Sequence, residues 1–306
     1  GQRFIQLLEN HPQFEITAVA ASDRSQGKSY GDACTWRLNG EMPQPVRSLP
    51  VQSPNPPLDC DLVFSSLPGD IARETEASFA AAGYAVISNS SAFRMQTEIP
   101  LVVPEINPEQ LAKHPGIIAN PNCAAIISIT PLWPIHRRNP VKRMIVSTYQ
   151  AASGAGAAAM EELRESTRAH LEGRSYQNTV LPHPYAFDLF SHNSKLDPAN
   201  GYNEEEMKVV KETHKIFGDP NIRIAATCVR VPVLRAHSIA INFECERPIT
   251  PAEVREIVSK APGVKVVDDV ERNYFPMPKD ASGQDPILVG RIRQDPSHER
   301  ALNLWV

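Results

Sequence analysis

Residues 116–127 restrict the possible folds of this chain more than any other stretch. An apolar run, Gly116 to Ala119, ends in Asn120-Pro121-Asn122, and a second apolar run opens on Cys123. Because proline disfavours helical backbone in the residue before it, a turn must separate the two runs. The pattern predicts a buried strand, a tight turn, and a helix whose first residue is a cysteine.

Cys123 therefore lies where a thiol is activated in many enzymes. The backbone N–H groups at a helix N-terminus and the positive end of the helix dipole both stabilise a thiolate. The alternative is a buried cysteine that packs as a small apolar side chain. We interpret Cys123 as a catalytic nucleophile, which needs a base close to it in space.

Strands and helices alternate in the part of the chain that leads to Cys123. Apolar segments predict strands at 14–20, 61–66, 84–88, 101–103 and 116–119, and helices from residue 4 and over 71–82. Such alternation favours a parallel sheet with helical crossovers, in which ligands bind beyond the carboxyl ends of the strands. The first part therefore predicts a Rossmann-type α/β domain.

The second part of the chain has a different pattern. Long strands are predicted at 141–149, 223–233 and 237–245, and shorter ones at 264–267 and 287–293. Helices are predicted up to residue 171 and over 204–217 and 251–260, with a loop-rich stretch to residue 201. We expect an α+β domain with a mixed sheet, and its long strands offer one face for burial against a second subunit.

Composition excludes several classes of function. With 306 residues the chain can form two domains, and its net charge of −4 without a basic stripe argues against nucleic acid. No apolar run has membrane-spanning length. The odd number and scattered spacing of the cysteines favour a reduced, cytoplasmic protein without a metal site; they are Cys34, Cys60, Cys123, Cys228 and Cys245.

The two ends of the sequence lead us to expect a fragment of a longer protein. The chain opens on Gly1 without an initiator methionine and ends at Val306, inside a strand-like pattern. An organellar targeting peptide would then lie outside this sequence.

Three residues of the second part are candidates for the reacting centre. His237 lies in a turn between two predicted strands and could be the base, or could be an ordinary turn histidine. Gln150 ends a strand before a glycine-rich turn and could orient a carbonyl group, although a strand-end polar residue is commoner. Arg230 lies in an otherwise apolar strand, so its guanidinium needs a partner such as a carboxylate.

Further charged residues could bind a charged substrate. Glu205 and Lys208 share one helix face, and their alternative interpretation is a solvated ion pair. Arg94 follows Ser90-Ser91-Ala92-Phe93 in a loop and suits an anion, or is simply exposed.

Polar residues near strand ends are candidates for cofactor binding. Ser22, Arg24 and Ser25 follow the strand where a dinucleotide fold holds the adenosine ribose, and an arginine with hydroxyls there suits the 2′-phosphate of NADP. Ser65 and Ser66 end another strand. The Ser153-Gly154-Ala155-Gly156 turn could approach a cofactor through its backbone, or could only lead into the next helix.

Taken in order, these motifs resemble those of the aspartate-β-semialdehyde dehydrogenases. The matching motifs are Asn120-Pro121-Asn122-Cys123, Gln150 with Ser153-Gly154-Ala155-Gly156, Glu205 with Lys208, and Arg230 seven residues before His237. The resemblance runs from Gly1 to Val306, and the loop at 22–28 and the surroundings of Trp36 resemble the archaeal and fungal branch. Gly1 matches the last glycine of the family's nucleotide loop, so we expect the first strand and the C-terminal segment to lie outside this sequence.

The resemblance implies an enzyme that reduces L-aspartyl-4-phosphate to aspartate semialdehyde with NADPH, a step towards lysine, threonine and methionine. It implies an NADP-binding domain over 1–122, a catalytic and dimerisation domain over 123–306, and a homodimer or homotetramer. The implied roles are attack by Cys123, acid–base catalysis by His237, acyl orientation by Gln150, substrate carboxylate and ammonium binding by Arg230 and Glu205, and phosphate binding by Arg94, Asn122 and Lys208.

Other functions are compatible with parts of the pattern. N-acetyl-γ-glutamyl-phosphate reductase runs the same chemistry on an acylated amine, which leaves no ammonium for Glu205 to bind. Malonyl-CoA reductase is a second relative without need of such a carboxylate. From another class, Cys123 and His237 could form a hydrolase dyad without a cofactor, and a non-catalytic fragment is a further alternative.

Overall fold

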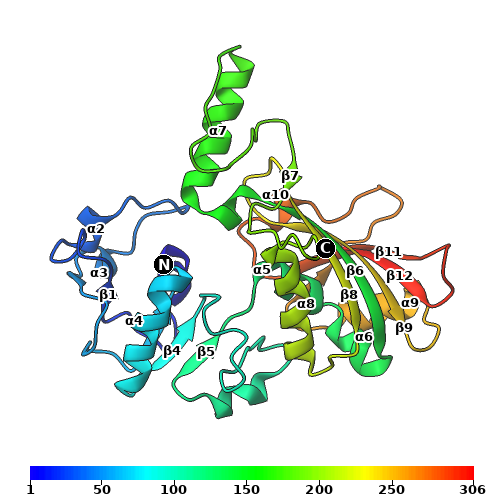
Figure 1. Cartoon of the computed structure of the whole chain (residues 1–306), viewed down its shortest axis with the longest axis horizontal. Helices are drawn as coiled ribbons and strands as arrows, with labels where there is room; N and C mark the ends of the chain where they lie inside the picture. The colour runs from blue at the N-terminus through cyan, green and yellow to red at the C-terminus, as the bar shows by residue number, and fades with distance from the viewer. The chain divides into compact units, whose positions relative to one another are not determined.

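The computed structural model describes residues 1–306, which form two compact units (Figure 1). Unit 1 comprises residues 1–102 and 109–121, and unit 2 comprises residues 103–108 and 122–306. None of the helices is both long enough and apolar enough to pass through a membrane.

Unit 1 is built on parallel strand pairs. Strands β3 (Leu62–Ser65), β4 (Ala85–Ser88) and β5 (Ile117–Ala119) form one parallel sheet, and β1 (Val19–Ala20) pairs in parallel with β2 (Val51–Gln52). The crossover helix α4 (Gly69–Ala81) buries Ala72, Glu76 and Phe79 at helical spacing. The remaining helices of this unit are short: α1 (Gln2–Leu8), α2 (Tyr30–Ala33) and α3 (Gln44–Arg47), with a 3₁₀ segment at Pro108–Lys113. The predicted parallel, Rossmann-type arrangement is confirmed.

Two predicted strands of unit 1 are wrong in extent. Only Val19 and Ala20 of the segment 14–20 pair with a neighbouring strand, and Phe14 is 44% exposed. The segment 101–103 makes a single bridge, from Leu101 to Ala119. In both cases the residues are apolar, but a strand forms only where a neighbour supplies hydrogen bonds, which hydrophobic pattern alone does not report.

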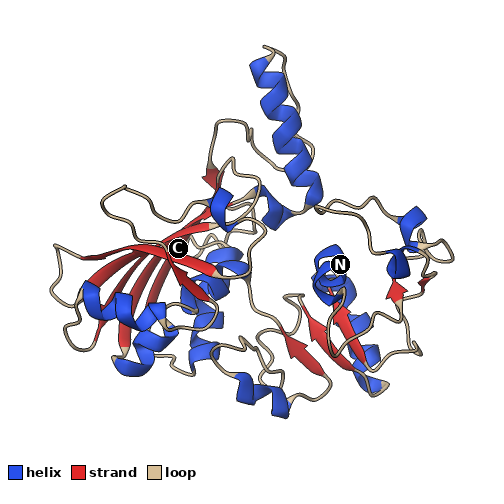
Figure 2. Cartoon of the chain, turned by 180° about the vertical axis from the view of Figure 1, so that it is seen from behind, coloured by secondary structure: helices blue, strands red, loops and turns tan.

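Unit 2 contains a mixed seven-stranded sheet in the order β10-β11-β12-β9-β6-β8-β7, seen from behind in Figure 2. Its strands are β6 (Val141–Gln150), β7 (Phe190–Ser191), β8 (Arg223–Arg230), β9 (Ser238–Cys245), β10 (Val264–Val266), β11 (Ile287–Gln294) and β12 (Ala301–Trp305). Its helices are α5 (Cys123–Ile129), α6 (Trp133–Arg138), α7 (Ala157–Leu171), α8 (Glu204–Phe217), α9 (Pro251–Ser259) and α10 (Pro278–Ala281), with a 3₁₀ turn at Ala152–Ala155. The predicted partly antiparallel sheet is thereby confirmed.

Alternate residues of the long strands face the core. In β6 the residues Met144, Val146 and Thr148 are at most 1% exposed, whereas the residues between them are partly exposed. Strand β8 ends at Arg230 rather than at Val233 as expected, because Pro232 has no N–H to continue the ladder.

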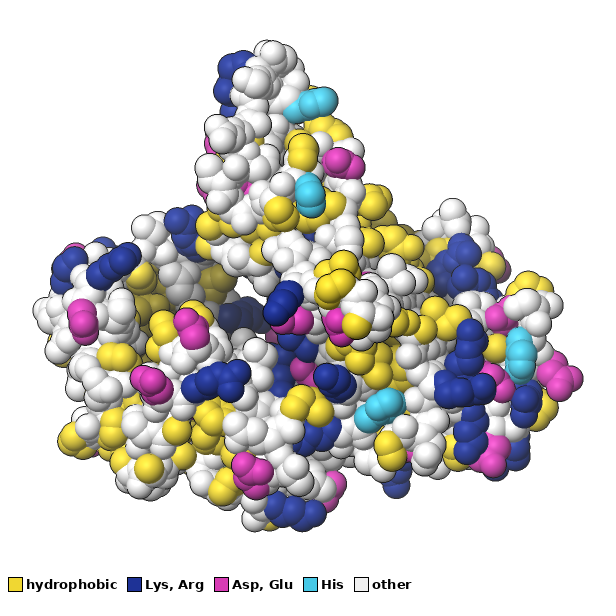
Figure 3. Space-filling view, viewed as in Figure 1, with side chains coloured by type: hydrophobic (Ala, Val, Ile, Leu, Met, Phe, Trp, Pro, Cys, Tyr) yellow, Lys and Arg dark blue, Asp and Glu magenta, His cyan; other side chains and the backbone are white.

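Helix α7 and residues 172–189 form an arm that projects from the sheet (Figure 1). Its small apolar core joins Met160 and Leu163 to Leu181 and Tyr185. Figure 3 shows hydrophobic side chains and histidines along this arm.

A buried carboxylate ties the two sides of the arm together. Glu162 is 3% exposed and accepts hydrogen bonds from the backbone N–H groups of Thr179, Val180 and Leu181. Burial alone would raise the pKa of Glu162, but these backbone donors outweigh it and lower the pKa.

We expect Glu162→Gln to lower the free energy of unfolding by about 2 kcal/mol, because the amide has one acceptor oxygen and turns an N–H₂ group towards backbone donors. The matched control is Glu161→Gln on the exposed face, which should change it by less than about 0.5 kcal/mol. Urea unfolding measures both. Since the pKa of Glu162 is lower in the folded state, its contribution is fully present above about pH 5 and is lost on acidification. Equal stability of the two variants would contradict this assignment.

Candidate active site

The turn before Cys123 is held by its own side chains and by a neighbouring helix. The Asn122 Oδ1 atom accepts the N–H groups of Ala124 (2.9 Å) and Ala125 (3.2 Å) and so caps α5, which begins at Cys123 as predicted. The side-chain amide of Asn122 donates to Glu205, and its backbone N–H donates to Glu212. The sequence suggested that N–H groups at the start of this helix stabilise a thiolate. Those of Ala124 and Ala125 donate to the Asn122 side chain instead.

Cys123 and His237 meet although they are 114 residues apart. Cys123 is exposed, and its Sγ lies 3.3 Å from the Nε2 atom of His237. His237 directly precedes β9, as expected, and follows Ala236, whose φ of +68° is unfavourable for a residue with a side chain. The backbone N–H of Ala151 donates to the His237 Nδ1 atom at 3.0 Å. Burial, and then the nearby Arg230 guanidinium, lower the pKa of His237 to about 4.

Glu205 is a buried carboxylate that accepts a hydrogen bond from the residue before Cys123. It is 5% exposed, and its Oε1 atom accepts hydrogen bonds from the side-chain amides of Asn122 (2.9 Å) and Gln150 (3.1 Å). Lys208 Nζ lies 3.2 Å from the other oxygen. Burial opposes its ionisation, but His192, Lys208 and the amide donors outweigh burial and lower the pKa of Glu205 to about 2. The Glu205–Lys208 pair is therefore a buried carboxylate with a partly exposed amine, not a solvated pair.

Gln150 is engaged at both ends of its amide. It donates from Nε2 to Glu205 and accepts the Thr148 hydroxyl at Oε1, and it is 1% exposed. The structure thus connects Gln150 to Glu205, and its expected role in orienting an acyl group stays a prediction.

Arg230 differs from expectation in its partners. The guanidinium is 4% exposed and donates to the Asn193 side-chain oxygen and to the Ala151 carbonyl, both at 3.3 Å, rather than to a carboxylate. A Cβ placed on Gly154 would lie 3.0 Å from both Arg230 Nη1 and His237 Cε1. A side chain at position 154 would therefore collide with Arg230 and His237, so a glycine is needed there.

Sequence reasoning missed several residues of this site. Glu212 lies seven residues after Glu205 on α8, and this spacing on one helix face was the available signal. His192 and Ser194 lie in the loop-rich stretch after β7, where Ser194 Oγ accepts the Glu205 N–H. Burial, with charges on Arg230, Lys208 and His237, lowers the pKa of His192 to about 4 despite the nearby Glu205. No periodicity marks loop residues of this kind.

The cofactor candidates Ser22, Arg24, Ser25, Ser65 and Ser66 all belong to unit 1. Arg24 is exposed in the turn that follows β1, where the Ser25 N–H donates to the Ser22 carbonyl. Ser65 ends β3, is 5% exposed, and its hydroxyl has no hydrogen-bond partner. An unsatisfied hydroxyl at the carboxyl end of a parallel strand fits the polar edge of a nicotinamide dinucleotide.

The remaining site candidates are Arg94 in unit 1 and Ser153 and Gly154 in unit 2. Arg94 is 7% exposed in unit 1 and donates to the Asn89 carbonyl, so it is not the exposed loop arginine of the alternative interpretation. Ser153 and Gly154 lie in the 3₁₀ turn of unit 2, where the Ser153 N–H donates to the Leu234 carbonyl.

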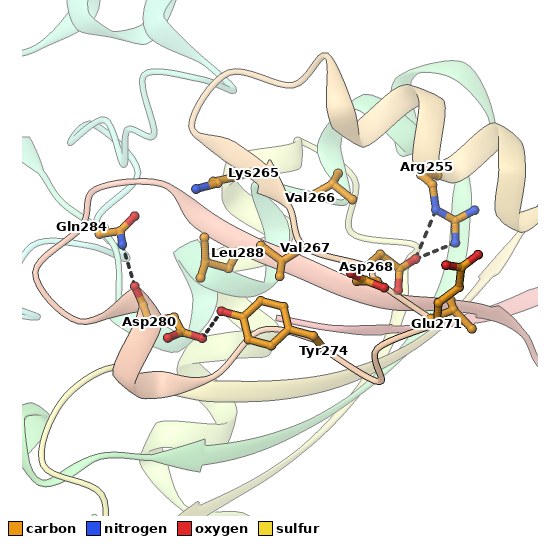
Figure 4. A pocket seen from close by; sticks show the side chains of 12 residues that line it. Arg255, Lys265, Val266, Val267, Asp268, Glu271, Tyr274, Asp280, Gln284 and Leu288 are labelled. Atoms are coloured by element: carbon orange, nitrogen blue, oxygen red, sulfur yellow. Dashed lines mark hydrogen bonds and ion pairs between the residues drawn. The ribbon is translucent and has the colours of Figure 1, made fainter.

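A wide hollow of about 990 Å³ beside β10 offers no comparable chemistry (Figure 4). Arg255 pairs there with Asp268, and the Tyr274 hydroxyl donates to Asp280. These charged and polar groups satisfy one another, and no thiol or imidazole lines the hollow.

The parallel-sheet unit, together with the mixed-sheet unit, fits the class of nicotinamide-dependent dehydrogenases. Models of the semialdehyde dehydrogenase family match both parts: the NAD binding domain matches residues 1–114, and the dimerisation domain matches residues 132–306. The aspartate-semialdehyde dehydrogenase of Synechocystis sp. is 50% identical over 310 residues, which cover 100% of this chain and 88% of that protein. The chain belongs to the aspartate-semialdehyde dehydrogenase family.

Solved structures agree with this assignment. The Vibrio cholerae aspartate semialdehyde dehydrogenase II, complexed with ASA, has a TM-score of 0.88 and 35% identity and covers 100% of this chain and 88% of its own. The Candida albicans enzyme with NADP has a TM-score of 0.80 and 28% identity over 100% and 89% of the two chains. The 50% identity to a cyanobacterial protein does not support the expected likeness to the archaeal and fungal branch.

The geometry predicts the order in which the cysteines react with iodoacetamide. Cys123 is exposed and should be alkylated first, whereas burial raises the pKa of Cys228 and of Cys245 to about 12 and should protect both until the protein unfolds. Burial, followed by the charges of Asp61 and Asp59, also raises the pKa of Cys60. Peptide mass spectrometry over time measures the order, and earlier alkylation of Cys60 or Cys34 would count against an activated Cys123.

Proposed function

We propose that this chain catalyses the NADPH-dependent reductive dephosphorylation of L-aspartyl-4-phosphate to L-aspartate 4-semialdehyde, a step towards lysine, threonine and methionine. The observation that carries the proposal is the 3.3 Å contact between Cys123 and His237, next to the buried Glu205 and Arg230. The family membership of the chain supports the same reaction.

The first half of the reaction needs only a nucleophile and a leaving group. The Cys123 thiolate attacks the acyl carbon, a C–S bond forms, and phosphate leaves with the electron pair of the broken C–O bond. Arg230 is the nearby cation that stabilises the negative charge on the sulfur, because its guanidinium donates to neutral oxygens and not to a carboxylate. We expect the carbonyl of this thioester to lie close to the Nε2 atom of His237, because the sulfur itself is 3.3 Å from that atom.

The two charged ends of an aspartyl group have matching residues. The ionised Glu205 suits the α-ammonium and Arg230 suits the α-carboxylate. Asn122 uses most of its polar atoms within the protein, so Lys208 is the better candidate of these two for the phosphate. Arg94 remains a proposed phosphate ligand from unit 1.

We assign NADPH rather than NADH as the cofactor, because exposed Arg24 with Ser22 and Ser25 follows β1 and suits a 2′-phosphate. Bound NADPH supplies the hydride that reduces the thioester. Ser65, Ser66, Ser153 and Gly154 are the other proposed cofactor contacts, and residues 1–122 and 123–306 are the proposed NADP-binding and catalytic domains. The cytoplasmic location expected from cysteine usage stays a prediction.

The alternatives are less well supported. Glu205 is ionised and buried, which suits an ammonium and disfavours the acylated amine of N-acetyl-γ-glutamyl-phosphate and malonyl-CoA, whose malonyl group carries no ammonium. A cofactor-free hydrolase has no need of the NAD binding domain that matches residues 1–114.

We also propose that the chain forms at least a dimer through the open face of its large sheet. Residues between the buried positions of β6, β9 and β12 form this face, with Ser147 opposite Ala240 at its centre and Tyr149 in contact with Trp305. The match of residues 132–306 to a dimerisation domain supports this location.

The protein should oxidise aspartate semialdehyde in the presence of phosphate and NADP, and the absorbance of the reduced cofactor measures this activity. Cys123→Ser should abolish this activity while NADP binding, measured by calorimetry, stays within about twofold, because the hydroxyl is a far weaker nucleophile. Retained turnover would remove Cys123 from its proposed role, and activity only with malonyl-CoA would replace the proposed substrate.

Arg24→Glu should weaken NADPH binding by about tenfold or more, because a carboxylate repels the 2′-phosphate, and should change NADH binding by less than about threefold. The control is Arg73→Glu on the exposed face of α4. Fluorescence titration gives both affinities, and equal losses for the two cofactors would exclude the 2′-phosphate role.

Ser147→Arg should shift the protein towards monomer, because it places an unpaired cation at the centre of the open sheet face. Ser259→Arg, at the exposed end of α9, is the matched control and should leave the assembly unchanged. Sedimentation velocity measures both, and an unaltered oligomer in Ser147→Arg would place the interface elsewhere.

A further inference from the structure

We propose that Asn193 is a positioning residue, which holds the Arg230 guanidinium through a neutral oxygen and so keeps its positive charge available for a ligand carboxylate. The inference rests on the proposed function, in which Arg230 meets the α-carboxylate of the substrate. It deepens that function, because it assigns control of the arginine to a residue in the loop-rich stretch after β7.

The contact between the two side chains uses one nitrogen of the guanidinium. Arg230 Nε donates to the side-chain oxygen of Asn193 at 3.3 Å, and Nη1 donates to the carbonyl of Ala151 at the same distance. Both acceptors are neutral. A guanidinium carries N–H groups on all of its nitrogens, and no group of the protein accepts a hydrogen bond from Nη2. The Nη2 end of Arg230 is therefore left for a ligand.

The loop that carries Asn193 is anchored on both sides of this residue. Before it, the His192 N–H donates to a carbonyl of β8 at 2.8 Å. After it, the Ser194 hydroxyl accepts the backbone N–H of Glu205 at 3.1 Å, in the first turn of α8. The loop thus joins the strand that ends in Arg230 to the helix that carries Glu205, and it holds the Asn193 amide in place against the guanidinium.

The other charges around Arg230 leave it without an anionic partner. Glu205 is the nearby carboxylate, but its oxygens are held by two side-chain amides and by Lys208, and it makes no hydrogen bond to Arg230. Burial lowers the pKa of both His192 and His237 to about 4, so both are neutral near pH 7. A carboxylate brought by a ligand is therefore the group that can pair with Arg230.

A charged acceptor at position 193 would change this balance. Asn193→Asp keeps the shape of the side chain and its acceptor oxygen, but it gives Arg230 a carboxylate that competes with the ligand. Asn193→Ala removes the acceptor and leaves the charge of Arg230 unpaired. The two substitutions therefore separate control of charge from mechanical support of the arginine.

The first test needs no turnover. Arg230 acts on Cys123 through its charge, so pairing of the guanidinium should disfavour the thiolate. Alkylation of Cys123 by iodoacetamide at about pH 7 should slow by about threefold or more in Asn193→Asp and change by less than about twofold in Asn193→Ala. The matched control is Asn273→Asp, which adds the same charge in an exposed turn before α10. Equal rates in the two aspartate variants would overturn the proposal.

The second test is the KM for aspartate semialdehyde at saturating phosphate and NADP. We expect Asn193→Asp to raise it by about tenfold or more and Asn193→Ala by less than about threefold, because only the carboxylate occupies the charge that the substrate needs. Circular dichroism checks that both variants fold, and an equal KM in two folded variants would show that Asn193 only supports the loop.

The two tests distinguish this proposal from the proposed function. A wild-type protein that does not oxidise aspartate semialdehyde would contradict the proposed function. Slower alkylation of Cys123 in Asn193→Asp than in Asn273→Asp would in that case still support control of the Arg230 charge by position 193.

Discussion

The site depends on how Asn122 is held. Four of its polar groups are used: Oδ1 and the carbonyl begin α5, the side-chain amide contacts Glu205, and the backbone N–H contacts Glu212. Glu205 and Glu212 are two turns apart on α8, so one helix face fixes the residue before Cys123 at two points. The direction of the Cys123 side chain follows from this clamp, because the first residue of a capped helix has little backbone freedom.

A second constraint is the separation of charge around the thiol. Glu205 and Arg230 are both nearly buried, yet each is held by other partners: Glu205 by two amides and Lys208, Arg230 by two neutral oxygens. A direct pair between them would neutralise both and leave nothing for a charged substrate. Burial of groups that keep binding capacity costs stability, and such groups are typical of functional sites.

Some groups have other hydrogen-bond partners in the structure than the sequence indicated. Gln150 has the expected place at the end of β6, but its amide is directed to Glu205. The helix N-terminus beside Cys123 exists, but its N–H groups satisfy Asn122. Residue type and order predict which groups reach a site, whereas the direction of each hydrogen bond depends on packing from segments far away in sequence.

By itself the sequence determined the α/β alternation, the helix that opens on Cys123, the helix 204–217 and most strands, because these follow from local periodicity, proline and capping residues. It also identified Cys123 and His237 as partners. Only the tertiary structure decided that the Ala151 N–H donates to the Nδ1 atom of His237, that Glu212 holds Asn122, and that 14–18 lack a partner strand. The reason is that hydrogen bonds between residues tens to more than a hundred positions apart leave no periodic signal in the chain.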